Sequence, residues 1–173
     1  MIKKISLFIY YLILKYLPRN ETMLFGSLSC FLRRLIVKFI FKSCGLGVNV
    51  NRGAYFGSGL NISIGDNSSI GENCKIANDT YIGNDVMMAP EVLIFSITHE
   101  TKDIHLPMRV QGNKLPRAVR IGNNVWIGQR AIILPGITIH DGAIVAAGSI
   151  VTKDVYEDEV VAGNPARVVK VRK

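Results

Sequence analysis

Apolar side chains recur at every sixth position over most of the chain after residue 45. Blocks that open with Ile, Val or Met begin at residues 64, 70, 76, 82, 88 and 94, and the same spacing returns at 121, 127, 133, 139, 145 and 151. Counted back from Leu46, thirteen of fifteen blocks open with an aliphatic residue, and Arg52 and Ser58 are the exceptions. The fifth position of a block is never charged. A short, fixed period of this kind is typical of a β-solenoid.

The chemistry of each block favours short strands joined by tight corners. Alternate residues of a strand face the same side, so positions one and five can both be buried. Gly at position two and Asn or Asp at positions three and four, as in Asp66-Asn67 and Asn123-Asn124, supply residues that tolerate the positive φ of a corner. A helix would require apolar spacings of three and four residues instead. Three blocks per coil would build a triangular prism, but the period alone leaves its handedness open.

The first 45 residues lack this period and carry a concentrated positive charge. Eight Lys or Arg residues oppose a single acidic residue, Glu21, and account for most of the net charge of +8. The segment predicts two helices, at residues 2–17 and 23–41, separated by Pro18-Arg19-Asn20. Its apolar run at residues 5–14 is shorter than the roughly 20 residues that span a bilayer. We therefore divide the chain into a helical, basic-amphipathic segment at 1–45 and a β-solenoid domain at 46–173.

Two roles remain open for the 1–45 segment. Arg34, Lys38 and Lys42 lie four residues apart and form a basic stripe beside an apolar surface, and such a helix can lie on an anionic membrane. Alternatively, both helices cap the first coil and pack against a neighbouring subunit, because the ends of a solenoid need covering. A nucleic-acid partner is not predicted, because no aromatic platform accompanies the charge.

The three cysteines predict a reducing, cytoplasmic location. No C-x-x-C pair is formed by Cys30, Cys44 and Cys74, and an odd number of cysteines leaves at least one unpaired. Neither a disulfide framework nor a zinc knuckle is therefore expected. Cys74 occupies an inward fifth position, where a small buried thiol is expected rather than a nucleophile.

The repeat is interrupted by a polar excursion of 21 residues at 100–120. A loop of that length in a compact domain is usually functional. The excursion leaves directly after His99, so this histidine stands at the root of a long loop on a rigid strand. That position suits a general base, although the residues alone allow a hydrogen-bonded turn histidine as well.

The repeats resemble those of the hexapeptide-repeat acyltransferases, and in particular the sugar and polysaccharide O-acetyltransferases, which include galactoside, nodulation-factor and colanic-acid acetyltransferases. The matching stretches are residues 82–90, 98–99, 111–112, 121–128, 147–154 and 162–167. The resemblance implies a mainly β fold, a left-handed parallel β-helix with an N-terminal α-helical segment and an extruded loop at 100–120. It also implies a homotrimer with active sites between subunits, and acetyl transfer from acetyl-CoA to a hydroxyl of a sugar or polysaccharide precursor.

The resemblance further implies a role for each matching position. His99 matches the general base that takes the proton of the acceptor hydroxyl as it attacks the thioester directly. The backbone N–H of Gly128 matches the donor to the developing oxyanion, and Trp126 matches a residue that lines the acceptor and the pantetheine arm. The other cofactor-binding positions are Gln129, Ala147, Thr152, Lys153, Arg167 and Lys170. Of these, Arg167 and Lys170 match residues near the 3′-phosphate of the cofactor.

On the acceptor side the chain departs from the galactoside enzymes. Ser69 stands where those enzymes use an Asn to contact the acceptor. Asp103, four residues after His99, is familiar from the polysaccharide branch and is expected to orient His99 or bind a sugar hydroxyl. These departures, with the N-terminal helices, favour the polysaccharide branch and hence polysaccharide biosynthesis. The enzyme is expected in the cytoplasm, and at the inner face of the membrane if the 1–45 segment has the first of its two open roles.

Three other functions fit parts of the sequence. An N-acetyltransferase acting on an amino sugar would use the same fold and donor. A γ-class carbonic anhydrase would hold zinc on three histidines, and the chain has three, His99, His105 and His140. His140 stands at a position usually occupied by Gly and is expected on an outer corner, so we predict no metal. A non-catalytic solenoid would leave His99 and the matching C-terminal stretches at 147–154 and 162–167 without a role.

Overall fold

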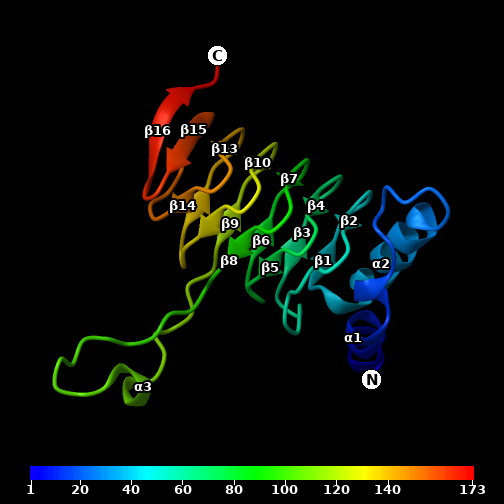
Figure 1. Ribbon diagram of the computed structural model, residues 1–173, viewed down its shortest axis with the longest axis horizontal. Coiled ribbons are helices and arrows are strands. Elements are labelled where there is room, and N and C mark those ends of the chain that lie inside the picture. The colour runs from blue at the N-terminus through cyan, green and yellow to red at the C-terminus, as the bar shows by residue number, and fades with distance from the viewer.

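The computed structural model describes residues 1–173 as a helical cap, a parallel β-helix and a C-terminal hairpin (Figure 1). The cap consists of α1 (Ile2–Leu12), the short 3-10 helix η1 (Leu14–Tyr16) and α2 (Gly26–Ile40). The first predicted helix therefore ends five residues early and continues as η1, and the second begins three residues late. The β-helix is left-handed, as the resemblance implied.

Short strands, all of two residues except β15, stack into the three faces of the β-helix. Face one holds β1 (Ser43–Cys44), β3 (Ser63–Ile64), β6 (Tyr81–Ile82), β9 (Arg120–Ile121) and β12 (Thr138–Ile139). Face two holds β2 (Asn49–Val50), β4 (Ser69–Ile70), β7 (Met87–Met88), β10 (Trp126–Ile127), β13 (Ile144–Val145) and β15 (Glu159–Gly163). Face three holds β5 (Lys75–Ile76), β8 (Leu93–Ile94), β11 (Ile132–Ile133) and β14 (Ile150–Val151). Antiparallel β16 (Ala166–Val171) pairs with β15 and closes the C-terminal end.

The core follows the predicted six-residue pattern. From residue 62 onward, the first and fifth positions of the blocks are buried, except Thr98, which is exposed where the excursion begins. The apolar residues at these positions form one hydrophobic cluster with the cap. Cys74 is fully buried at its fifth position, as predicted. The prediction that positions one and five share the interior is confirmed, because the short strands and corners turn both toward the axis.

The first coil departs from the predicted phase. Ser43 pairs with Ser63 and Asn49 with Ser69, so this coil is two residues longer than the 18-residue coils that follow. Leu46, which was predicted to open a block, is 72% exposed, and the buried residues are Val48, Val50, Ala54 and Phe56. Arg52 and Ser58 broke the pattern because they do not occupy first positions. The β-helix also begins at β1, before the predicted boundary at residue 46.

Hydrogen bonds from backbone N–H groups to Asn and Asp side chains hold successive coils together at the corner between faces one and two. The backbone N–H of Leu46 donates to Asp66 Oδ1 at 2.7 Å, and that of Asp66 donates to Asn84 Oδ1 at 2.7 Å. The same bond joins Asn84 to Asn123 at 2.9 Å and Asn123 to Asp141 at 2.7 Å. At this corner the polar third position of the block therefore fixes the stacking of the neighbouring coil.

The helical cap closes the N-terminal end through a buried arginine. The Arg33 side chain is fully buried, and its Nε donates to the carbonyl oxygen of Val50 at 3.0 Å. Its two terminal nitrogens donate to the carbonyl oxygens of Leu14 and Pro18 and to Asn20 Oδ1. A buried guanidinium is tolerated only when its donors are satisfied in this way. The helices of the 1–45 segment thus cover the first coil, as one of the two roles predicted, while their contact with a neighbouring subunit stays a prediction. None of these helices has the length and hydrophobicity to cross a membrane.

Candidate active site

The excursion forms an arm that projects away from the β-helix between β8 and β9 and carries the short helix α3 (Met108–Gln111) at its far end (Figure 1). Its two limbs pair near the root. The N–H of Arg117 donates to the Ser96 carbonyl at 2.8 Å, and the N–H of Lys114 donates to the Thr98 carbonyl at 2.8 Å. The arm therefore leaves earlier than the predicted span of 100–120, and Arg120 already belongs to β9.

His99 stands at this root and pairs with Asn113 in an antiparallel bridge. Its imidazole is exposed and makes no hydrogen bond within the chain. The neighbouring Thr98 and Glu100 line a hollow of about 690 Å³ beside the root. Because alternate residues of an extended segment face opposite sides, His99 presents its ring to the other side of the arm. The backbone is fixed there, while the ring is exposed and forms no hydrogen bond.

Asp103 lies farther out on the arm and does not orient His99 within the chain. Its carboxylate accepts a hydrogen bond from the N–H of His105 at 2.8 Å. The side chain of Gln111 braces the same turn, because its Oε1 accepts from the Asp103 N–H and its Nε2 donates to the Asp103 carbonyl. Asp103 thus shapes the arm in the single chain.

Trp126 and Ser69 share face two. Trp126 is 49% exposed on β10, between Met87 of β7 and Ile144 of β13. Ser69 lies one coil before Met87, where its N–H donates to the Val86 carbonyl at 2.9 Å. Met87 is 60% exposed and was not predicted as a site residue. The sequence could have indicated Met87, because it is an apolar residue at an outward-facing strand position, and the structure places it beside the indole of Trp126.

The corner between β10 and β11 brings Gly128, Gln129 and Ala147 together. A Cβ on Gly128 would lie 2.5 Å from the Ala147 nitrogen, so only glycine allows this approach of neighbouring coils. The Gly128 N–H donates to the Val145 carbonyl at 2.8 Å and is therefore already engaged. The N–H groups of Gln129 and Ala147 make no backbone hydrogen bond, and both residues are exposed.

Basic residues gather at the C-terminal end. Lys153 and Arg167 line a hollow of about 200 Å³ between the last coil and the closing hairpin. Arg167 Nη1 donates to the Ala166 carbonyl at 2.9 Å, and exposed Lys170 pairs with Val160 across the hairpin. Thr152 is exposed directly after β14. The predicted cofactor residues are thus spread over the last coils: Trp126 and Lys170 lie on face two, Gln129 and Ala147 at the corner that follows it, and Thr152 and Lys153 at the corner after face three.

The three histidines do not share a site. His140 is exposed at a corner, as predicted, and its ring stacks on Tyr156 with centroids 5.6 Å apart. His105 lies on the arm beyond His99. Nowhere in residues 1–173 do three His, Cys, Asp or Glu side chains lie close enough to hold one metal ion.

Comparison with known proteins supplies the family. The profile described as "Bacterial transferase hexapeptide (six repeats)" matches residues 61–96 and 118–153 and leaves out the arm. The chain is 39% identical over 140 residues to the galactoside O-acetyltransferase of Escherichia coli K12, which covers 80% of this chain and 68% of that protein. The chain belongs to the hexapeptide-repeat acetyltransferases. The predicted enzyme class is confirmed.

Two solved structures of this family cover nearly the whole chain. A maltose O-acetyltransferase from Clostridium difficile 630 matches with a TM-score of 0.78 and 33% identity over 99% of this chain and 86% of that one. A galactoside acetyltransferase in complex with coenzyme A matches with a TM-score of 0.78 and 33% identity over 98% of this chain and 78% of that one. Because these matches exceed 97% of the chain, they include the helical cap as well as the β-helix.

Proposed function

We propose that this acetyltransferase moves the acetyl group of acetyl-CoA to a hydroxyl of a sugar or polysaccharide precursor, with His99 as general base. The observation that carries the proposal is the exposed, unpartnered imidazole of His99, held by backbone pairing at the root of the arm. The family membership and the coenzyme A complex of a relative supply the reaction class.

In the proposed reaction, His99 accepts the proton of the acceptor hydroxyl as that oxygen bonds to the thioester carbonyl carbon. The carbon–sulfur bond then breaks, and the imidazolium returns the proton to the departing sulfur. Protons and electron pairs balance without a covalent enzyme intermediate. General-base assistance of this kind is typically worth about 10²–10⁴ in rate.

The oxyanion donor that the structure supports is the N–H of Gln129. The Gly128 N–H was the predicted donor, but it is committed to the Val145 carbonyl at 2.8 Å. The next N–H along the corner, that of Gln129, is exposed and free. A preorganised backbone donor stabilises charge that develops on the carbonyl oxygen, and such a donor is worth about 10²–10³ in turnover.

The donor side of the proposed site follows the last coils. The free N–H of Ala147 and the exposed Thr152 would contact the pantetheine arm, and Trp126 would lie beside it. Lys153, Arg167 and Lys170 place positive charge at the C-terminal end, where Arg167 and Lys170 would hold the 3′-phosphate of acetyl-CoA.

The proposed enzyme is a homotrimer with each site between two subunits. Within one chain His99 belongs to the arm beyond face three, whereas Trp126 and Ser69 lie on face two, so a neighbour would bring them together. The arm exposes apolar side chains that nothing in the chain covers: Ile104, Leu106, Met108, Val110 and Leu115. Burial of these residues against a neighbour would stabilise the trimer, because about 25 cal/mol is gained per Å² of apolar surface buried. Ser69 and Asp103 would then contact the acceptor.

We further propose that the cap lies on the inner face of a membrane where polysaccharide precursors are made. The outer sides of α1 and α2 expose a row of apolar residues that includes Ile2, Ile5, Phe8, Leu28 and Leu35. Exposed Lys38 lies on the same outer side of α2, and an apolar face edged by lysine is typical of helices that bind anionic lipid.

A screen of coenzyme A release tests the proposed function. Purified protein would be mixed with acetyl-CoA and neutral sugars, amino sugars, nucleotide sugars and lipid-linked oligosaccharides. Product analysis by mass spectrometry and mild base would distinguish an ester from an amide. Turnover with a hydroxyl acceptor is expected. An amide product would favour N-acetylation, and no turnover with any acceptor would contradict the proposal.

A further inference from the structure

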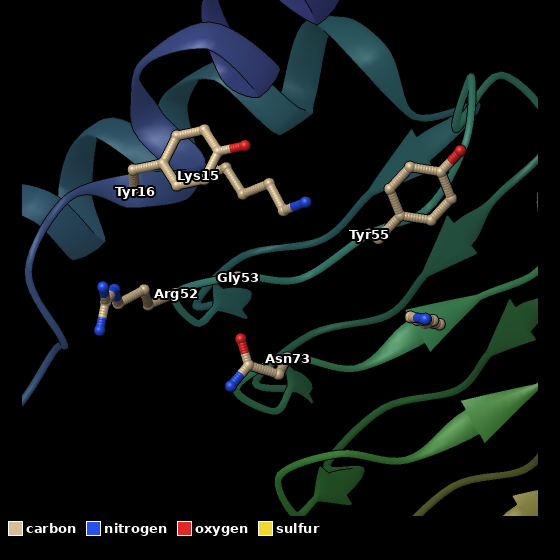
Figure 2. Close-up of a pocket in the computed structure, with 7 residues that line it drawn as sticks. Lys15, Tyr16, Arg52, Gly53, Tyr55 and Asn73 are labelled. Atoms are coloured by element: carbon tan, nitrogen blue, oxygen red, sulfur yellow. The ribbon is translucent and has the colours of Figure 1, made fainter.

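A basic hollow of about 650 Å³ lies where the cap meets face three (Figure 2). Lys15 and Tyr16 of η1 form one side, and the first two coils form the other. Three segments that are distant in the sequence therefore build it, and its lining is completed by Arg52, Gly53, Tyr55, Asn73 and Lys75. No carboxylate belongs to this lining.

The charges in this hollow are not neutralised by the protein. Lys15, Arg52 and Lys75 take part in no ion pair and donate no side-chain hydrogen bond. The carboxylate nearest in sequence, that of Glu72, accepts a bond from Arg19 at 2.9 Å. It lines an adjoining hollow together with Glu21, and Arg52 borders both hollows without forming an ion pair with either carboxylate. Clustered cations inside a concave surface raise the local potential and concentrate anions.

Aromatic rings hold the Lys15 ammonium in place. Its Nζ lies 5.4 Å from the ring centroid of Tyr55 and 5.7 Å from those of Tyr11 and Tyr16. The carbonyl of the same residue accepts a hydrogen bond from the Gly53 N–H at 2.9 Å. Rings attract an ammonium without cancelling its charge, so Lys15 is positioned and still able to bind an anion.

Neutral donors add to the cations. The hydroxyls of Tyr16 and Tyr55 and the side-chain amide of Asn73 make no hydrogen bond in the structure, and all three residues are exposed. Asn73 packs its Oδ1 against Gly53, where a Cβ would lie only 1.9 Å away. Gly53 thus lets the amide stand directly over the neighbouring coil, where Figure 2 shows it facing the cap.

We propose that this hollow binds the phosphate or diphosphate group of the sugar acceptor, an inference that rests on the proposed function. Three free cations and three neutral donors suit the several oxygens of such a group. The hollow lies at the capped end of the β-helix, whereas the proposed 3′-phosphate contacts lie at the opposite end (Figure 1). It is therefore a second anion site, assigned to the acceptor rather than to acetyl-CoA.

Binding of inorganic pyrophosphate tests the site directly. Full-length protein is first saturated with coenzyme A, so that the donor site is filled, and pyrophosphate is then titrated in a calorimeter. Lys15→Ala, Arg52→Ala and Lys75→Ala should each weaken binding about tenfold, since a charge-assisted contact is worth about 1.5 kcal/mol or more. Lys75→Arg should restore it. Arg120→Ala is the matched control, because exposed Arg120 stacks over Tyr81 on face one. No heat of binding, or equal loss in the control, would overturn the proposal.

Kinetics separate this inference from the proposed function. The acceptor found by the screen is compared with its own 1-phosphate. The phosphate should lower the acceptor KM, and Lys75→Ala should raise that KM about tenfold while leaving the KM of the neutral sugar unchanged. Transfer to both acceptors with equal KM would overturn the inference and leave the acetyltransferase activity standing. Absence of any transfer would contradict the activity, while the pyrophosphate titration would still decide the site.

The phosphate could be carried by a free sugar phosphate or by a lipid. Flotation with phosphatidylcholine vesicles that contain a polyprenyl phosphate distinguishes the two sources. If the protein floats with these vesicles and Lys75→Ala abolishes flotation, the acceptor is lipid-linked. If the protein does not float with them but the soluble 1-phosphate lowers the acceptor KM, the acceptor is a free sugar phosphate.

Discussion

His99 and Asn113 pair in an antiparallel bridge at the root of the arm, although fourteen positions separate them in the sequence. The bridge fixes the backbone of the proposed base while leaving its ring exposed. The N–H of Glu100, which donates to the Gly112 carbonyl at 3.0 Å, extends the pairing on the far side. A base that must meet an acceptor hydroxyl within hydrogen-bonding reach benefits from such a fixed root.

Gly128 is expected to tolerate no side chain. In Gly128→Ala the new Cβ would lie 2.5 Å from the Ala147 nitrogen, so two coils must separate and disturb the free N–H groups of this corner. We expect a lower free energy of unfolding, by about 1–3 kcal/mol, and a raised KM for acetyl-CoA. Urea unfolding and initial rates measure both.

Gly148→Ala is the matched control for Gly128→Ala. Gly148 has a positive φ of 69°, but a Cβ there meets no atom within 4 Å. Only the backbone strain of about 1 kcal/mol should appear, with the KM for acetyl-CoA nearly unchanged. Equal effects of the two substitutions on KM would show that the close approach at Gly128 has no part in cofactor binding.

The Cys74 thiol should resist alkylation in the native protein. Burial raises the pKa of the Cys74 thiol to about 11, so at pH 8 the reactive thiolate is scarcely present. Mass spectrometry after iodoacetamide treatment should find partly exposed Cys30 labelled first and Cys74 labelled only on unfolding.

The same shift links Cys74 to stability at high pH. The folded pKa lies above the unfolded value of about 8.5, so the folded state disfavours the thiolate. This contribution to stability is complete below about pH 8.5 and is lost as the pH rises toward 11. Cys74→Ala should reduce the loss of stability at alkaline pH. Rapid labelling of native Cys74 at pH 8 would contradict the assignment of Cys74 as a buried thiol with a raised pKa.

Arg167 and Lys170 should act on the donor alone. Replacing both by Ala should raise the KM for acetyl-CoA about tenfold or more, because charge-assisted contacts to the 3′-phosphate are lost. The KM for acetyl-dephospho-CoA, which lacks that phosphate, should hardly change. If both donors weaken equally, these residues are only part of a solvated C-terminal hairpin.

The cap should bind anionic membranes in a salt-dependent way. Full-length protein should float with vesicles that contain phosphatidylserine, bind pure phosphatidylcholine weakly and dissociate as ionic strength rises. Lys38→Glu combined with Lys42→Glu should abolish flotation without unfolding the protein, because both side chains are exposed. Indifference to anionic lipid would leave the cap with its structural role alone.

The repeat made most of the β-helix predictable, because the position of a residue within its block predicts whether its side chain faces the interior. The phase failed only in the first coil, where the two additional residues lie close to Gly57 and Gly59, both with positive φ. Nothing in a six-residue count reveals an inserted pair until it is known that Leu46 is exposed while Val48 and Ala54 are buried. Handedness came from the resemblance, because strand periodicity is the same in either hand.

The candidate site was predictable as a set of residues but not as a set of contacts. The resemblance implied that the Gly128 N–H donates to the oxyanion, and only the coil stacking shows that this N–H is engaged by the Val145 carbonyl. Likewise, Asp103 bonds its own turn rather than His99. The basic hollow escaped notice because Lys15, Arg52 and Lys75 meet only after the cap folds onto the first coils.

The most direct test of the account is the turnover number of His99→Ala with a saturating acceptor and acetyl-CoA. Removal of the base should lower kcat by about 10²–10⁴, while acetyl-CoA still binds through the last coils. His105→Ala on the arm and His140→Ala, whose ring only stacks on Tyr156, serve as controls and should lose far less. Near-normal turnover of His99→Ala would contradict the mechanism, and equal damage from all three histidines would contradict the assignment of one general base.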